Sequence, residues 1–213
     1  MIQGPICFIV GAGTWTEQTL PVAPGDLLIA ADGGWLPLQA IGLTPDIVLG
    51  DFDSAPAPAA VPVRRFPVRK DQTDMQLAIE YGRQQGFCRF ALYGGTGGRI
   101  DHTLANVQCL LGLARQGAQA ILYGNGFALC VLADGALRFP PEATGTLSVF
   151  ALGGPAQGVE EQGLSYPAQG VVLSPDCPTG VSNAFTGTPA RVAVQSGALL
   201  LYWQRPNPDP VWE

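Results

Sequence analysis

Residues 27–54 read LLIAADGGWLPLQAIGLTPDIVLGDFDS, and this stretch decides the fold. Its two short apolar runs, LLIAA and IVLG, end at glycine or aspartate, as buried strands of a parallel sheet do. Between them, residues 35–41 predict a short helix with Leu36 and Leu38 facing the core. A strand, a helix and a second strand in this order predict a β-α-β unit, the connection that joins parallel strands.

The same alternation continues on both sides of this unit. Residues 6–12, 87–95 and 120–124 predict further strands. Thr73 and Gln76 have the spacing of a capping box and predict a helix that ends near Gln85. A second helix is predicted over residues 101–115, because apolar residues recur there every three or four positions. Its predicted inward residues are Leu104, Val107, Leu110, Leu111 and Ala114. The first half therefore predicts a mostly parallel sheet covered by helices.

The second half has a different pattern. Residues 126–213 show no helical period, and short apolar runs alternate with glycine, proline and aspartate. Residues 133–135 and 196–197 are typical of hairpin turns. We therefore expect an α/β domain over residues 1–125 and an all-β domain, a sandwich, over residues 126–213.

Composition and charge exclude several classes of protein. The net charge is −6 and only 13% of residues are charged, which favours a compact globular chain. A nucleic-acid-binding surface is not expected, because the basic residues form one small cluster at Arg64, Arg65, Arg69 and Lys70. No apolar run is long enough to span a membrane, and no signal peptide is evident. The five cysteines form no C-x-x-C pair. A cytoplasmic protein is expected.

Carboxylates follow the predicted strands. Asp32 ends one strand, and Asp51 and Asp53 follow the next. Two carboxylates two residues apart point to the same side of an extended segment, and Mg²⁺ prefers such oxygens together with substrate phosphates. The alternative is that Asp51 and Asp53 only shape a turn.

Two other segments carry polar chemistry at a helix start. In residues 70–74, KDQTD, Thr73 and Asp74 can be ordinary capping residues, or Asp74 can face a metal while Lys70 faces phosphate at the helix N-terminus. In residues 94–102, GGTGGRIDH, the glycines permit close approach of a ligand and Arg99 can fork onto phosphate oxygens. His102 is either a catalytic base or a bystander. No Walker A motif, G-x-S-x-G motif or complete dinucleotide fingerprint is present.

Taken together, these motifs resemble the thiamine pyrophosphokinase family. The resemblance rests on ADGG at 31–34, PDIVLGDFDS at 45–54, DQTD at 71–74, GGTGGRIDH at 94–102 with Asn106, and SN at 182–183. It implies a Rossmann-like α/β catalytic domain followed by a β-sandwich domain that binds thiamine. It also implies a homodimer with active sites between subunits, and the conversion of thiamine and ATP to thiamine diphosphate and AMP.

The resemblance and the chemistry of these residue types together assign roles to particular residues. Metal ligands for Mg²⁺ would be Asp51, Asp53 and Asp74. The ATP and diphosphate site would include Asp32, Gly33, Lys70, Gln72, Thr73, Gly97 and Gly98. Catalytic residues would be Asp71, Arg99 and Asp101, with Asp71 or Asp101 accepting the hydroxyl proton. Thiamine would meet Ser182 and Asn183.

Some points depart from the family pattern or stay open. The short segment before Asp32 predicts that the usual first helix is reduced or missing. Trp203 either flanks the thiamine rings or belongs to the core. Two other functions are weighed against the kinase: the same transfer to another alcohol, such as a hydroxymethylpterin, and a non-catalytic nucleotide or thiamine sensor.

Overall fold

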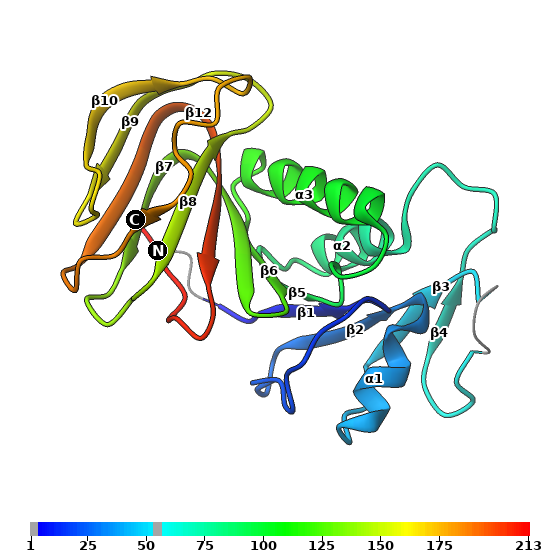
Figure 1. Cartoon of the computed structure of the whole chain (residues 1–213). Coiled ribbons are helices and arrows are strands. Elements are labelled where there is room, and N and C mark those ends of the chain that lie inside the picture. The colour runs from blue at the N-terminus through cyan, green and yellow to red at the C-terminus, as the bar shows by residue number, and fades with distance from the viewer. Residues whose placement is uncertain (1–3, 53–56) are drawn as a thin grey trace. The chain divides into compact units, whose positions relative to one another are not determined.

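The computed structural model describes residues 4–52 and 57–213, which form two compact units (Figure 1). The α/β unit contains the described residues up to 109 and residues 122–125, and the β unit contains residues 110–121 and 126–213. Residues 110–121 thus group with the β unit, although the sequence places them before the expected boundary at residue 125.

The α/β unit is built on parallel strands. They are β1 (Cys7–Val10), β2 (Leu27–Ala31), β3 (Ile47–Gly50), β4 (Val63–Arg65) and β5 (Arg89–Tyr93). Their order is β5-β1-β2-β3-β4, and each neighbouring pair is parallel. The chain therefore moves outward from β1 to β4 and returns to the other side of β1. This reversal is the place where open α/β sheets bind ligands, beyond the carboxyl ends of the strands.

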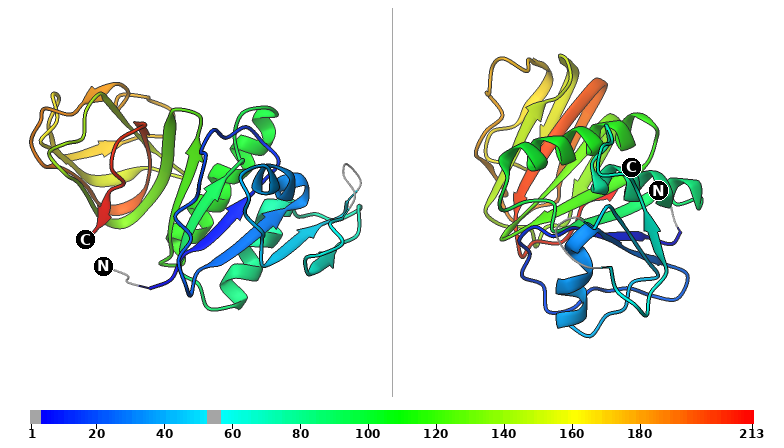
Figure 2. Two further views of the ribbon diagram at one scale, coloured as in Figure 1. Left: turned by 90° about the horizontal axis from the view of Figure 1, so that it is seen from below. Right: turned by 90° about the vertical axis from the view of Figure 1, so that its right-hand side faces the viewer.

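Helices cover both faces of this sheet. They are the short 3-10 helix η1 (Asp32–Gly34) and the helices α1 (Trp35–Ala40), α2 (Asp74–Gln84) and α3 (Ile100–Arg115). Two further views show α1 on the opposite side of the strands from α2 (Figure 2). No helix occurs between β1 and β2, a segment that is described throughout, so the predicted loss of the first helix is confirmed.

Two of the predicted helix faces are wrong in part. Leu38 is fully buried, but Leu36 is exposed. On α3, Leu104 is 60% exposed, whereas Val107 and Leu110 are buried as predicted. The apolar residues of α1 and α3 fit more than one inward face, and the packing partners select which one is buried.

The segment expected to be only a connector contains an edge strand. β4 pairs with β3 through Val48, whose N–H donates to the carbonyl oxygen of Pro62 (2.9 Å). Phe66 in turn donates to the carbonyl oxygen of Gly50 (3.0 Å). The strand is only three residues long and lies in a proline-rich stretch, so its sequence gives little strand signal.

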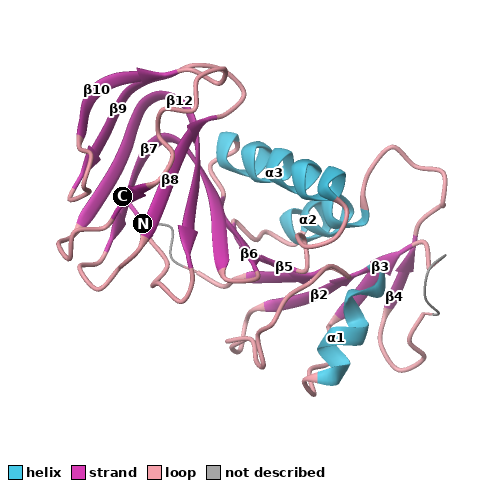
Figure 3. Cartoon of the chain, viewed as in Figure 1, coloured by secondary structure: helices cyan, strands magenta, loops and turns pink. Residues whose placement is uncertain are grey.

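The second unit consists mainly of antiparallel strands, shown in magenta in Figure 3. They are β7 (Phe127–Phe139), β8 (Thr146–Ala151), β9 (Ala156–Gln162), β10 (Ala168–Leu173), β11 (Asn183–Ala184), β12 (Ala190–Gln204) and β13 (Val211–Trp212). β12 pairs with β7 along its length, and on its other edge with β9 and then with β8. One long strand therefore joins two groups of strands. The residues of β6 (Gln119–Gly124) are divided between the two units, with 119–121 in the β unit and 122–124 in the α/β unit.

The two predicted hairpin turns are wrong, because both lie inside long strands. Asp134 has a φ of +45° within β7, and Gly197 has a φ of +105° within β12. The register of the pair shifts between Val194 and Ala198, and the Gly197 N–H donates to Asp134 Oδ1 (2.9 Å). Turn-forming residues here make facing bulges that bend two paired strands instead of reversing one.

Trp203 belongs to the core of the β unit. Its side chain is fully buried and packs edge-on against Phe139, with ring centroids 5.6 Å apart. The alternative in which Trp203 flanks a bound thiamine is therefore not supported. All five cysteines are free. Among the helices of the described residues, none is long and apolar enough to cross a membrane.

Candidate active site

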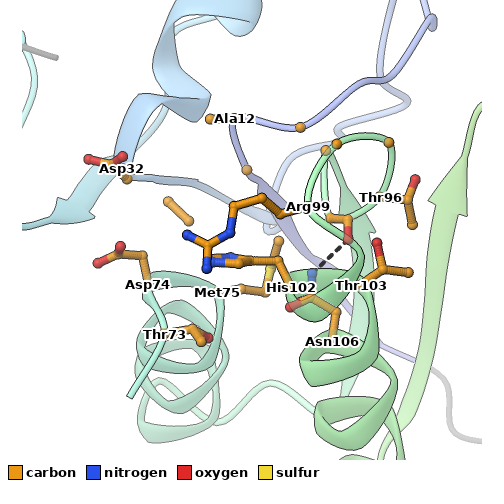
Figure 4. Close-up of a pocket in the computed structure, with 17 residues that line it drawn as sticks. Ala12, Asp32, Thr73, Asp74, Met75, Thr96, Arg99, His102, Thr103 and Asn106 are labelled. Atoms are coloured by element: carbon orange, nitrogen blue, oxygen red, sulfur yellow. Dashed lines mark hydrogen bonds between the residues drawn. The ribbon is translucent and has the colours of Figure 1, made fainter. Parts of the chain in front are cut away.

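A cavity of about 320 Å³ lies beyond the carboxyl ends of β1, β2 and β5, at the reversal of strand order. Figure 4 shows the side chains that line it. The lining residues are Gly11, Ala12, Gly13, Ala31, Asp32, Thr73, Asp74, Met75, Gly94, Gly95, Thr96, Gly97, Gly98, Arg99, His102, Thr103 and Asn106. Most of them follow a strand or begin a helix, so backbone N–H groups are concentrated around the cavity.

Two glycine segments run against each other on one wall. Gly11 donates its N–H to the carbonyl oxygen of Tyr93 and Gly13 donates to Gly94, both over 2.8 Å. Gly94 has a φ of +62°, and an added Cβ there would collide with the carbonyl oxygen of Gly11. Glycine is required at this point because the two backbones leave no room for a side chain.

Asn106 holds the second glycine segment from α3. It is buried, and its Nδ2 donates to the carbonyl oxygen of Gly95 over 2.7 Å, the dashed line in Figure 4. A Cβ at Gly95 would lie 2.9 Å from that Nδ2 atom. The asparagine therefore fixes the loop that presents Gly97, Gly98 and Arg99 to the cavity.

The start of α2 forms another wall. Thr73 is the N-cap, and its Oγ1 accepts a hydrogen bond from the Gln76 N–H (3.2 Å). The predicted N-cap is thus confirmed, while the Gln76 side chain turns to Glu80 (3.2 Å) and does not complete the capping box. Asp74 sits in the first turn, where a carboxylate is favoured by the helix dipole.

An ammonium group lies between two carboxylates beside this wall. Lys70 Nζ is 2.9 Å from Asp51 Oδ2 and 2.9 Å from Asp74 Oδ1, and all three side chains are mostly buried. Partial burial acts to lower the pKa of Lys70, but hydrogen bonds and attraction from Asp74 and Asp51 outweigh it and raise the pKa. The position between the two carboxylates therefore favours a cation.

Arg99 and Asp101 form an exposed ion pair at the start of α3. Arg99 donates from Nε to Asp101 Oδ1 (3.2 Å) and from Nη2 to Asp101 Oδ2 (2.5 Å). The pKa of Asp101 is lowered, first by the hydrogen bond from Arg99. The Arg99 guanidinium thus binds the Asp101 carboxylate through two hydrogen bonds, a geometry that also suits a phosphate.

The structure brings together only some of the predicted nucleotide and metal residues. Those that line the cavity are Asp32, Thr73, Asp74, Gly97, Gly98 and Arg99. Lys70 joins them through its ion pair with Asp74, and Asp51 joins them through its ion pair with Lys70. Gln72 instead donates to Glu80 (2.7 Å), and Gly33, Asp71 and Asp101 do not line the cavity. The prediction for Asp53 falls outside the described residues.

Sequence reasoning missed several lining residues. Gly11, Ala12 and Gly13 form one wall, although the sequence there lacks the third glycine of a complete dinucleotide fingerprint. A G-x-G after a buried strand was the signal that could have found them. The sequence does not mark Met75 and Thr103 as cavity residues, because their position at the cavity depends on which face of each helix packs toward it.

The predicted thiamine residues line a second cavity, of about 590 Å³, within the β unit. Ser182 has a φ of +61°, and its N–H donates to Ser148 Oγ (3.0 Å). The Asn183 amide is buried and uses its full hydrogen-bonding capacity within the protein. It donates to Glu161 Oε2 and to the carbonyl oxygen of Tyr166, both over 2.8 Å, and accepts from the N–H groups of Tyr166 and Ala184, both over 2.9 Å.

The parallel sheet and the cavity at its reversal define an α/β protein with a ligand site at the carboxyl ends of the strands. Two family models match the chain. "Thiamin pyrophosphokinase, catalytic domain" matches residues 22–122, and "Thiamin pyrophosphokinase, vitamin B1 binding domain" matches residues 136–199. Together they cover most of the chain, the first mainly on the α/β unit and the second within the β unit. The chain belongs to the thiamin pyrophosphokinase family.

One curated relative and two solved structures are similar to this chain. A thiamine pyrophosphokinase of Bacillus subtilis is 35% identical over 91 residues, which span 39% of this chain and 42% of the relative. The crystal structure of thiamine pyrophosphokinase from Bacillus subtilis has a TM-score of 0.83 at 22% identity, covering 93% of this chain and 98% of that chain. The enzyme from Geobacillus thermodenitrificans gives 0.79 at 25% identity, covering 93% and 97%.

Proposed function

We propose that this chain transfers a diphosphate group from ATP to the hydroxyl of thiamine and releases AMP and thiamine diphosphate. The observation that supports this most directly is that the catalytic and vitamin B1 binding family models match in order. Each match includes residues that line one of the two cavities. The same proposal includes a Rossmann-like catalytic domain over residues 1–125 and a thiamine-binding sandwich over residues 126–213.

ATP would bind in the cavity of the α/β unit. The free N–H groups at the start of α2 and the glycine segments suit phosphate oxygens. Arg99 would leave Asp101 and fork onto the transferred phosphates. Gly97, Gly98 and Asp32 lie along the same cavity, and Gly33 and Gln72 are next in sequence to the lining residues Asp32 and Thr73.

The acidic residues fit a Mg²⁺ ion. The described residues hold no cluster of three or more metal-ligating side chains, but Asp51 and Asp74 already flank a cation, the Lys70 ammonium. Mg²⁺ is commonly held by one or two carboxylates together with waters and substrate phosphates. Asp51 and Asp74, with Asp53, would therefore hold it. When bound, it would neutralise charge on the phosphates. Lys70, once displaced, would be free to contact phosphate.

The thiamine hydroxyl would attack the β-phosphorus of ATP, and AMP would leave in line. Positioning and charge neutralisation supply most of the catalysis in such transfers. The hydroxyl proton would go to Asp71 or Asp101. While Asp101 is paired with Arg99 its pKa is lowered. Transfer of Arg99 to phosphate would raise that pKa again and make Asp101 a better proton acceptor.

A direct assay tests this function. Purified protein with ATP, Mg²⁺ and thiamine is expected to form AMP and thiamine diphosphate in equal amounts, measured by chromatography. ADP or thiamine monophosphate as the product would contradict the proposal. Turnover with a hydroxymethylpterin but not with thiamine would assign the same chemistry to another alcohol, and binding of both ligands without turnover would indicate a sensor.

Replacement of Arg99 by lysine is expected to lower kcat/KM for ATP by about 10-fold or more, because an ammonium cannot form the two parallel hydrogen bonds of a guanidinium. Steady-state kinetics at varied ATP would measure it. The control is Arg115→Lys at the other end of α3, which should leave kcat/KM unchanged. Wild-type kinetics for Arg99→Lys would show that Arg99 does not bind the phosphates.

The family resemblance also implies a homodimer with an active site between subunits, and this assembly is part of the proposal. The proposal also keeps the cytoplasmic location expected from the sequence. Sedimentation equilibrium on the purified chain is expected to give twice the monomer mass.

A further inference from the structure

The cavity of the β unit contains a buried carboxylate to which no role is assigned. Glu161 lies on β9 and is only 4% exposed. It alternates with the buried Val159, so it occupies an inward-facing position where a strand normally places an apolar residue. A buried carboxylate is costly unless something pairs with it.

Only one of the two carboxylate oxygens of Glu161 has a hydrogen-bond partner within the described residues. Its Oε2 accepts a hydrogen bond from Asn183 Nδ2 (2.8 Å). Within the part of the chain that the structure describes, its other oxygen, Oε1, has no hydrogen-bond partner and no cation forms an ion pair with it. Burial raises the pKa of Glu161, and the hydrogen bond from Asn183 only partly opposes this. A ligand that donates a hydrogen bond would complete the site.

The rest of this cavity suits a flat organic ring. Its side walls are mainly apolar, with Val171, Leu173 and Val181 among them, and none of its lining residues is basic. The lining side chains of Tyr166 and Val172 are largely exposed, so the apolar surface is open to a ligand. Apolar walls with one precisely placed polar group are typical of small-molecule sites.

Asn183 fixes the direction of the free oxygen. Because every donor and acceptor of its amide is used, Asn183 cannot turn to meet a ligand without breaking a bond. It therefore acts as a positioning residue that holds Glu161 Oε2 and leaves Oε1 for the ligand.

We propose that Glu161 is a specificity-determining residue that accepts a hydrogen bond from the amino group of the thiamine pyrimidine. This rests on the proposed function. Thiamine has two hydrogen-bond donors, the pyrimidine amino group and the hydroxyl. The hydroxyl must reach ATP for the transfer, so the amino group is the donor left for Glu161. The positive charge of thiamine also favours a site that contains a carboxylate.

Calorimetric titration of the full chain with thiamine, and with its analogue that carries hydrogen in place of the amino group, tests this. Wild-type protein is expected to bind thiamine about 10- to 100-fold more tightly than the analogue, the range for a hydrogen bond to a charged group. In Glu161→Gln, the glutamine must turn its oxygen to Asn183 Nδ2 and its NH₂ to the cavity. That variant should lose most of the preference for thiamine, as in a double-mutant cycle.

The control is Glu160→Gln, the neighbouring carboxylate, which pairs with Arg191 and does not line the cavity. It should keep the wild-type preference. Equal binding of both compounds by wild-type protein, absence of binding, or a preference retained in Glu161→Gln would each overturn the assignment. If Glu161→Gln does not fold, the comparison of thiamine with its analogue on wild-type protein still tests the assignment. AMP formation from thiamine by the wild type is scored separately, so the kinase proposal can stand when this one fails.

Discussion

Asp51→Asn is expected to lower the kcat of AMP formation by at least about 100-fold while the fold is retained. The substitution keeps the shape of the side chain but removes one of the two carboxylates that flank Lys70 Nζ. Without the Asp51 carboxylate, a divalent cation and the phosphates it neutralises would be held weakly. Lys70 keeps its ion pair with Asp74, so the local structure should survive.

Kinetics at varied Mg²⁺ and thermal unfolding would together measure this effect. The Mg²⁺ concentration for half-maximal rate should rise, and the melting temperature should change little. Glu142→Gln, an exposed carboxylate of the β unit outside both cavities, is the matched control and should behave as wild type. Unchanged kcat and unchanged Mg²⁺ dependence in Asp51→Asn would remove Asp51 from the metal site.

Gly94→Ala is expected to cost about 2–4 kcal/mol of folding stability. Alanine disfavours the φ of +62° at this position, and its Cβ would collide with the carbonyl oxygen of Gly11. A backbone oxygen cannot rotate away as a side chain can, so the ends of β1 and β5 would have to separate. The KM for ATP should rise as well, because both glycine segments line the cavity.

Chemical denaturation and ATP kinetics would test this prediction. The matched control is Gly112→Ala on α3, where an added Cβ meets nothing within 4 Å. This control should be neutral or stabilised by up to about 1 kcal/mol, because alanine is the better helix former. A Gly94→Ala protein as stable as wild type would show that the two segments are not held as closely as the structure has them.

Local chemistry made part of this structure predictable. Thr73 caps α2 because its hydroxyl needs only the N–H of Gln76, three residues away. The buried strand β1 follows from an unbroken apolar run. The N-terminal end of α3 follows from glycines, Arg99 and Asp101 in one segment. In each case the interacting groups are close in sequence, so the pattern determines the outcome.

Long-range packing decided what the sequence left open. Asp134 and Gly197 have the same turn preference in a bulge as in a hairpin, and only their pairing across β7 and β12 selected the bulge. The sequence predicts that Lys70 faces phosphate, and only the fold shows that Asp51, 19 residues away, lies within 2.9 Å of its Nζ. An ammonium beside two carboxylates forms ion pairs with both of them.

The opening stretch of sequence determined a β-α-β unit with carboxylates at its strand ends, because apolar runs and terminal aspartates are local properties. The motif order along the chain determined the family. Only the tertiary structure showed that Gly11 and Gly94 lie in contact at one cavity, and that Glu161 is buried with a free oxygen in another. The physical reason is the same in both places. Whether a backbone or a carboxylate is close to a partner depends on which strands become neighbours, and strand neighbours are chosen by the packing of the whole unit.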